Sequence, residues 1–365
     1  MFNKALYCAL FLIHKISEVV MKIKLTLMFF LVLLLSACGE EPAIPQTLTV
    51  MTHDSFAVSD EVLAAFEEKN NVTVSFIRSG DTGSAVNAAI LASGKPIADV
   101  FYGVDNTFLS RALEEDIFEV YASPLLTEIP DGFKLDEGNR ALPVDFGDVC
   151  LNYDLAYFEE HDLAVPTHLD DLRRPEYAGL LAVPNPASSS PGLAFLFTTL
   201  GFYGGEGYLE YWQDLVNNDV KVVNDWETVY YTEFSRWGGE RPIVVSYGSS
   251  PPFEVLFAEE PIETPPTGVL ASRMSCFRQI EFVGILKGTE NRELAEKWVD
   301  FMLSTAFQED LPLQMYVFPV NPNAELDQVF VDYLVVAEDP IMLDPEMISE
   351  YREEWIRRWR EVVLQ

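Results

Sequence analysis

The strongest constraint on the fold is an alternation of strand and helix patterns that begins at residue 48. Residues 48–52 and 72–77 are rich in β-branched side chains and typical of buried strands, and residues 61–69 between them carry apolar side chains at helical spacing. A strand, a helix and a second strand in this order predict a parallel βαβ unit. The alternation continues in a helix expected at 85–93, a strand at 98–102 and a helix at 107–113. The pattern therefore predicts an α/β fold.

Two long extended runs divide this alternation into two blocks. Residues 141–153 form one run, which Gly147 interrupts, and residues 278–286 form the other. Two α/β blocks joined by two extended crossings predict a hinged bilobal architecture, with the ligand cleft at the carboxyl ends of the strands. The expected parts are lobe one at 48–143 and 282–320, lobe two at 144–281, and C-terminal helices of unassigned lobe at 321–365.

Residues 1–37 have the pattern of a signal peptide. Lys22 and Lys24 form a basic start, and an apolar run at 25–35 follows them. This run is shorter than the about 20 residues that a membrane-spanning helix needs. Because the segment before Met21 adds nothing to a signal peptide, we expect translation to start at Met21.

The apolar run ends in Leu35-Ser36-Ala37-Cys38, which resembles the lipobox of bacterial lipoproteins. The resemblance implies cleavage before Cys38 and attachment of a lipid to its thiol. Residues 38–47 would then form a tether, and the lipid would hold the protein to the extracytoplasmic face of the membrane. The alternative is a retained membrane-spanning segment.

Net charge limits the partners that the protein can bind, and cysteine content bears on its disulfides. The chain has 24 basic and 58 acidic residues, a net charge of −34, which repels nucleic acid and anionic lipid and concentrates cations near a cleft. In the folded part, Cys150 and Cys276 form a disulfide in an oxidising compartment or remain two buried thiols. No cluster with metal-ligand spacing and no nucleophile motif is present in the sequence, so we expect no metal, cofactor or catalytic residue.

The loop Gly80-Asp81-Thr82-Gly83-Ser84 joins a predicted strand to a predicted helix. Its glycines suit a tight turn, Thr82 or Ser84 is placed to cap the helix, and its free amides are expected to face the cleft. We expect Asp81 or Thr82 to contact a ligand. Asp-Thr-Gly also resembles the aspartic-protease motif, but that chemistry needs a second copy, which the sequence lacks.

Other polar and aromatic side chains also follow predicted strands. Asp105 follows the third strand, as a ligand contact or as a solvated loop acid. Ser189 and Ser190 precede a helix that starts with proline, where polar or anionic groups bind, unless one serine simply caps the helix. Trp226 and Tyr247 can stack on a flat cationic ligand; the alternative is that they are core aromatics.

Several of these segments, in this order, resemble thiamine-binding proteins of ABC importers. The resemblance rests on residues 48–106, 144–150, 186–193, 246–251, 303–308 and 318–320, together with Trp226. It implies a type II-like periplasmic-binding-protein fold with no catalytic activity. It also implies the ligand contacts Asp81, Thr82, Ser189, Ser190, Trp226, Tyr247 and Ser250. Tyr316 stands where the family commonly has a tryptophan.

The function implied by the resemblance is that of a monomeric, exported solute-binding lipoprotein. It would capture thiamine, or thiamine phosphates, and deliver the ligand to the permease of an ABC transporter. One alternative is ferric-iron binding, because Tyr230-Tyr231 resembles the paired tyrosines of iron-binding relatives. The other alternative is an exported hydrolase or aspartic-type protease.

Overall fold

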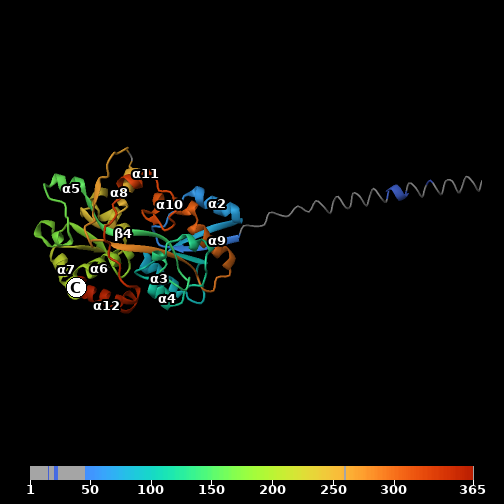
Figure 1. The fold of residues 1–365 in the computed structure, drawn as a ribbon, viewed down its shortest axis with the longest axis horizontal. Helices are drawn as coiled ribbons and strands as arrows, with labels where there is room; N and C mark the ends of the chain where they lie inside the picture. The colour runs from blue at the N-terminus through green and yellow to red at the C-terminus, as the bar shows by residue number, and fades with distance from the viewer. Residues whose placement is uncertain (1–14, 16–19, 24–45, 259, 365) are drawn as a thin grey trace, which may run out of the picture. The chain divides into compact units, whose positions relative to one another are not determined.

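The computed structural model describes residues 15, 20–23, 46–258 and 260–364 (Figure 1). The chain divides into two units, Met1–Pro45 and Gln46–Gln365, and the second unit carries the fold. Cys38 and nearly all of the expected signal peptide and tether lie outside the described residues. Within the described ranges, no helix combines the length and the apolar character needed to cross a bilayer.

One mixed sheet runs through the second unit in the strand order β2-β1-β3-β9-β4-β7-β5-β6, with β8 and β10 paired to β4 (Figure 1). The strands are β1 (Gln46–Thr52), β2 (Val72–Arg78), β3 (Val100–Asp105), β4 (Leu142–Asp154), β5 (Leu181–Pro184), β6 (Lys221–Val223), β7 (Ile243–Tyr247), β8 (Thr267–Leu270), β9 (Phe277–Ile285) and β10 (Phe318–Pro319). Neighbouring strands are parallel within β1–β3 and within β5–β7. The predicted α/β fold is confirmed.

The strands β4 and β9 connect the two parallel groups. β9 pairs antiparallel with β3 on one side and with β4 on the other. The first part of β4 pairs with β9 and its last part with β7. These two strands occupy the extended runs predicted at 141–153 and 278–286. In their register, Asp145 stands opposite Glu281, beside an irregularity that begins after Pro143.

Five α-helices and two short 3-10 helices lie near β1–β3 in the described chain, and the α-helices bury apolar side chains. They are α2 (Asp60–Asn70), α3 (Thr82–Leu91), α4 (Leu109–Glu114), α9 (Arg292–Leu303) and α10 (Thr305–Met315), with the short 3-10 helices η1 (Pro124–Glu128) and η2 (Asp131–Phe133). Ser59 caps α2 by accepting a hydrogen bond from the Val62 amide. On α9, the indole of Trp298 is fully buried and meets the Phe66 ring edge-on at 5.0 Å. This helical periodicity was visible in the sequence because only one face of α9 is apolar.

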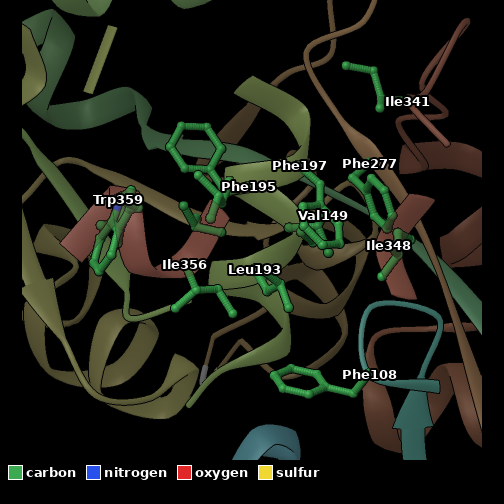
Figure 2. Close-up of a cluster of buried hydrophobic side chains, with 14 of the residues drawn as sticks. Phe108, Val149, Leu193, Phe195, Phe197, Phe277, Ile341, Ile348, Ile356 and Trp359 are labelled. Carbon is green, nitrogen blue, oxygen red and sulfur yellow. The ribbon is translucent and has the colours of Figure 1, made fainter. Parts of the chain in front are cut away.

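The elements around β5–β7 contribute much of a second and larger buried cluster, which also contains Met51, Phe101 and Phe108 of the first strand group. These elements are α5 (Leu155–Glu160), η3 (Leu169–Arg173), η4 (Pro175–Tyr177), α6 (Ser190–Tyr203), α7 (Gly207–Asn217), the π-helix η5 (Thr228–Glu233), η6 (Ser235–Trp237), α8 (Ser250–Leu256), α11 (Gln328–Tyr333) and α12 (Pro345–Val363). Helix α6 is buried along most of its length, so it is apolar on every face. Figure 2 shows its Leu193, Phe195 and Phe197 beside Ile356 and Trp359 of α12.

The C-terminal segment packs mainly against the second core and also reaches the first. Ile341 pairs with Phe277, at the start of β9, and Val335 donates a hydrogen bond to the Gly248 carbonyl. Helix α12 lies against α7 and against α4 (Figure 1). Residues 321–365, whose lobe the sequence left open, therefore contact elements of both groups.

Cys150 and Cys276 are joined by a disulfide, with Cα atoms 4.5 Å apart. Cys150 lies on β4, and Cys276 directly precedes β9, whose Phe277 is opposite Val149. Of the two sequence alternatives, the structure contains the disulfide rather than two free thiols. The bond ties the two connecting strands together at one end of their pairing.

Candidate functional site

A cavity of about 260 Å³ lies between the two strand groups. Loops that follow β1 and β2 supply His53, Asp54, Ser55, Ala57, Asp81 and Thr82. Elements of the second group supply Ser190, Pro191, Trp226, Glu227, Tyr231, Tyr247 and Phe253, and the remaining lining is Glu281 with residues 314–317. The cavity is therefore at the position predicted for the cleft, because the loops at the carboxyl ends of the parallel strands converge there.

Asp81 lines the cavity and joins its two sides. One carboxylate oxygen accepts a hydrogen bond from the Thr82 amide at 2.7 Å and the other from the Trp226 amide at 3.1 Å. Burial raises the pKa of this carboxyl, while donors led by Ser189 and the Trp226 amide act to lower it. The residue that caps α3 is Asp81, so the prediction of Thr82 or Ser84 as cap was wrong. An extended backbone at Asp81 turns its carboxylate toward the first helical amide.

Thr82 and Ser190 lie together where the first turns of α3 and α6 meet. The Ser190 hydroxyl donates to the Thr82 hydroxyl at 3.2 Å and accepts from the Gln279 amide at 3.1 Å. Beside them, the Gly83 amide donates to the Ser188 carbonyl at 3.1 Å. A Cβ atom on Gly83 would stand 2.8 Å from that carbonyl oxygen, so the close approach requires glycine here.

Aromatic side chains form one wall of the cavity. The Trp226 ring stacks on Tyr230 at 5.2 Å and meets Tyr247 and Tyr316 edge-on, each at 6.0 Å. The Tyr316 ring stacks on Phe253 at 3.4 Å. Three aromatics predicted from separate parts of the sequence, Trp226, Tyr247 and Tyr316, therefore lie in one cluster that lines the cavity. The set of Trp226, Tyr247 and Tyr316 is called the aromatic wall below.

Three predicted ligand contacts, Asp105, Ser189 and Ser250, are fully buried and do not line the cavity. Asp105 accepts hydrogen bonds from the amide and the hydroxyl of Thr107. Ser189 caps α6. The Ser250 hydroxyl hydrogen-bonds the Ser246 hydroxyl and accepts from the Tyr247 amide. These side chains hold the loops that carry cavity residues, and their sequence positions at strand ends did not reveal which way they point.

A cluster of buried acids reaches the cavity through Glu281 and was missed in the sequence. Tyr102 donates its hydroxyl to Asp145 at 2.6 Å and lies 3.2 Å from a carboxyl oxygen of Glu281. The other oxygen of Glu281 lies 3.5 Å from the His53 ring. The available signal was an acid between two apolar side chains in each of the two extended runs, Asp145 between Val144 and Phe146 and Glu281 between Ile280 and Phe282. The set of His53, Tyr102, Asp145 and Glu281 is called the acidic wall below.

Burial dominates the electrostatics of the acidic wall. It raises the pKa of Asp145 to about 7, and burial together with the nearby Asp145 raises the pKa of Glu281 well above its usual value. Burial, with a smaller contribution from Arg78, lowers the pKa of His53 to about 4. His53 is therefore neutral at pH 7 and cannot serve as the counter-ion of the acids.

The paired tyrosines of the iron-binding alternative point to different partners. Tyr230 donates its hydroxyl to Glu254 at 2.7 Å, whereas the Tyr231 hydroxyl lies 3.0 Å from that of Tyr316. Within the part of the chain that the structure describes, no group of three His, Cys, Asp or Glu side chains is arranged to hold a metal ion.

Comparisons with known proteins agree with this architecture. Residues 95–333 match the family model for bacterial extracellular solute-binding proteins. The thiamine-binding periplasmic protein of Salmonella typhimurium is 27% identical over 337 residues, which cover 90% of this chain and 97% of that protein. The solved structure of a periplasmic thiamin binding protein, 25% identical, superposes with a TM-score of 0.77 over 89% of this chain and 98% of that one.

A ferric binding protein from Campylobacter jejuni, 19% identical, shares the fold with a TM-score of 0.70 over 86% of this chain and 99% of its own. The fold is thus the predicted bilobal, type II-like periplasmic-binding-protein fold, with two α/β lobes and the cleft between them. Proteins of this kind bind solutes and are not enzymes, which removes the hydrolase and protease alternatives. The chain belongs to the family of bacterial extracellular solute-binding proteins.

Proposed function

We propose that the protein captures thiamine and delivers it to the permease of an ABC importer. The observation that carries this proposal is one cavity whose lining combines the aromatic wall with Glu281 of the acidic wall. Thiamine is a flat aromatic cation, so its rings match Trp226, Tyr247 and Tyr316, and its positive charge matches the carboxylates. Similarity to proteins named for thiamine binding supports the same ligand.

The charge of the lining favours thiamine over its phosphates. Four acids, Asp54, Asp81, Glu227 and Glu281, are among the described residues that line the cavity, and that set contains no Lys or Arg. Of the hydroxyls of Thr82 and Ser190, that of Ser190 already donates to Thr82, which leaves the Thr82 hydroxyl to donate to a phosphate. A phosphate ester would bring negative charge against these acids without a cation to neutralise it. We therefore expect the diphosphate to bind more weakly than thiamine.

Isothermal titration of the purified protein with thiamine, thiamine monophosphate and thiamine diphosphate tests this assignment. We expect a dissociation constant of about 1 μM or lower for thiamine. Absence of heat at protein concentrations well above that value would contradict the proposal. Mass spectrometry of small molecules released from the purified protein by denaturation gives an independent readout of the natural ligand.

Ferric iron is the second candidate, because two phenol oxygens, those of Tyr231 and Tyr316, lie 3.0 Å apart beside the cavity. Phenolate is a hard oxygen ligand that suits Fe(III). Burial raises the pKa of both hydroxyls, which opposes the deprotonation that iron binding needs. Adding Fe(III) citrate should therefore produce no visible tyrosinate-to-iron band. A band that disappears in Tyr231→Phe would favour iron over thiamine.

We also propose that the lobes are residues 48–143 with 282–320 and residues 144–281, and that β4 and β9 form the hinge between them. The protein would act as a monomer, held at the outer face of the membrane by a lipid on Cys38. Membrane fractionation of cells that express the full chain tests the anchor. Cys38→Ala should move the protein from the membrane fraction to the soluble one, and an unchanged distribution would exclude the lipid as its attachment.

A further inference from the structure

The acidic wall has too few hydrogen-bond donors for its carboxyl groups. Tyr102 provides one hydroxyl for both Asp145 and Glu281. Asp145 is fully buried, and its second oxygen has no hydrogen-bond partner among the described residues. The buried Nε2 atom of His53 likewise makes no hydrogen bond there, although this ring lines the cavity. Two adjacent buried carboxylates without a cation are unstable, and sharing one proton relieves their repulsion.

The pair is located where a ligand and the hinge meet. Asp145 and Glu281 are opposite each other on β4 and β9, the two strands that connect the lobes. Glu281 lines the cavity, whereas Asp145 lies behind it and does not. A positive charge that enters the cavity therefore meets Glu281 directly and Asp145 only through Glu281.

We infer that Glu281 is the counter-charge for a cationic ligand, and that the Asp145–Glu281 pair releases its shared proton when that ligand binds; this inference rests on the proposed function. In the empty cavity, one proton lies between the two carboxyl groups. When the cation arrives, the O–H bond breaks, its electrons remain on the carboxylate and the proton passes to the solvent. The ligand's fixed positive charge takes the place of the proton, so the site rejects a neutral molecule of the same shape.

Among the residues that the structure describes, the side chains facing the pair include no Lys or Arg. The titratable groups that face it come from every neighbouring strand, namely His53 after β1, Tyr102 and Asp105 on β3, and Tyr247 on β7. Arg78 on β2 acts on His53. Because the neighbouring acids add negative charge, the pair holds its proton until the ligand's charge replaces it. We therefore expect proton release only when both the Asp145–Glu281 pair and a positively charged ligand are present.

Isothermal titration can separate charge recognition from shape recognition. Wild-type protein is titrated at pH 7 with thiamine and with deazathiamine, the isostere in which a neutral thiophene replaces the thiazolium. Each titration is run in phosphate and in Tris, buffers with different ionisation enthalpies, so the difference in heat gives the number of protons released. We expect up to one proton per thiamine and none for deazathiamine.

Two substitutions distinguish the roles of the pair. Glu281→Gln should weaken thiamine binding by about 30-fold, with little effect on deazathiamine, and should abolish proton release. Asp145→Asn leaves Glu281 ionised without repulsion, so it should retain thiamine binding while losing proton release. Glu290→Gln, at an exposed position beyond the end of β9, removes the same charge and should change neither quantity. Thermal unfolding of each variant verifies that it is folded.

The outcomes separate this inference from the proposed function. If the wild-type protein binds no thiamine, the proposed function fails. If it binds thiamine without releasing protons, or if Glu281→Gln weakens both ligands equally, thiamine binding stands and the role of Glu281 is overturned. If Glu281→Gln does not fold, Asp145→Asn decides the matter, because unchanged proton release in that variant contradicts the shared proton.

Discussion

The two walls of the cavity differ in how completely their polar atoms are paired. On the aromatic wall, the Trp226 indole, the Tyr247 hydroxyl and the Tyr316 hydroxyl have hydrogen-bond partners at 3.2, 3.1 and 3.0 Å. On the acidic wall, His53 and Asp145 each have a buried atom without a hydrogen bond within the described chain. Unpaired buried polar atoms are costly, so the acidic wall is the side that changes when a ligand arrives. The aromatic wall is preorganised.

The largest effect is expected when the preorganised wall loses its central ring. Trp226 touches Tyr230, Tyr247 and Tyr316, so Trp226→Ala should remove both a stacking surface and the support of its neighbours. We expect thiamine affinity to fall by about 2–3 kcal/mol, measured by isothermal titration.

Trp355→Ala is the matched control, because Trp355 lies on α12, packs against Phe197 and does not line the cavity. Its thiamine affinity should equal that of the wild-type protein. An unchanged affinity in Trp226→Ala would mean that Trp226 is only a core aromatic, which is the alternative that its sequence context left open.

The comparison of the walls also separates what the sequence could predict from what it could not. The bounds of β2 (Val72–Arg78) and α2 (Asp60–Asn70) agree to within one residue with the strand predicted at 72–77 and the helix predicted at 61–69, because local periodicity and caps determine them. Residues of the aromatic wall were predictable from local sequence, because Trp226 stands between two acids after a strand and Tyr247 ends a strand before glycine, serine and proline. The acidic wall was not, because the pairing of Asp145 with Glu281 depends on the register of two strands more than 100 residues apart.

The same limit applies to two predicted ligand contacts, Ser189 and Ser250, which do not line the cavity. The positions of Ser189 and Ser250 at helix starts were visible in the sequence, and the structure has α6 and α8 begin there. A strand end or a helix start fixes where the backbone lies, but packing decides whether the side chain faces a ligand or a neighbouring loop. Both serines face neighbouring loops and are fully buried.

A smaller effect is expected where the two sides of the cavity are joined. In Asp81→Asn, the side-chain oxygen can still cap α3, but an amide nitrogen then faces the Trp226 amide, and two donors cannot bond. We expect thiamine affinity to fall by about 1–2 kcal/mol, while urea unfolding shows a much smaller loss of stability. Asp154→Asn, at the cap of α5 outside the cavity, is the control. Equal affinities for the two variants would show that the contact of Asp81 with Trp226 does not assist binding.

The acidic wall should give affinity and stability opposite dependences on pH. Its raised pKa values mean that, between about pH 4 and 7, the folded protein holds protons that the unfolded chain has lost. Stability of the ligand-free protein should therefore fall as pH rises through 7, whereas thiamine affinity should rise, by at most about 1.4 kcal/mol per pH unit for each proton. Urea unfolding and titration at pH 6, 7 and 8 measure both.

Glu281→Gln should flatten the affinity profile and leave part of the stability slope. The remaining part comes from Asp145, which stays buried in this variant, and from Asp105, whose pKa burial raises to about 7 and which does not line the cavity. If thiamine affinity and stability of the wild-type protein changed in the same direction as pH rises, the acidic wall would not release a proton when the ligand binds.

The smallest effect is expected from loosening the aromatic wall without removing a ring. Tyr316→Phe keeps the stacking on Phe253 but deletes the hydroxyl that pairs with Tyr231. Because Tyr231 is 46% exposed, water can replace the lost partner, so thiamine affinity should fall by about 0.5–1 kcal/mol. Isothermal titration with thiamine measures the change, and Tyr333→Phe, outside the cavity, is the control. A loss as large as that of Trp226→Ala would mean that Tyr316 contacts the ligand through its hydroxyl, so the aromatic wall would recognise polarity as well as shape.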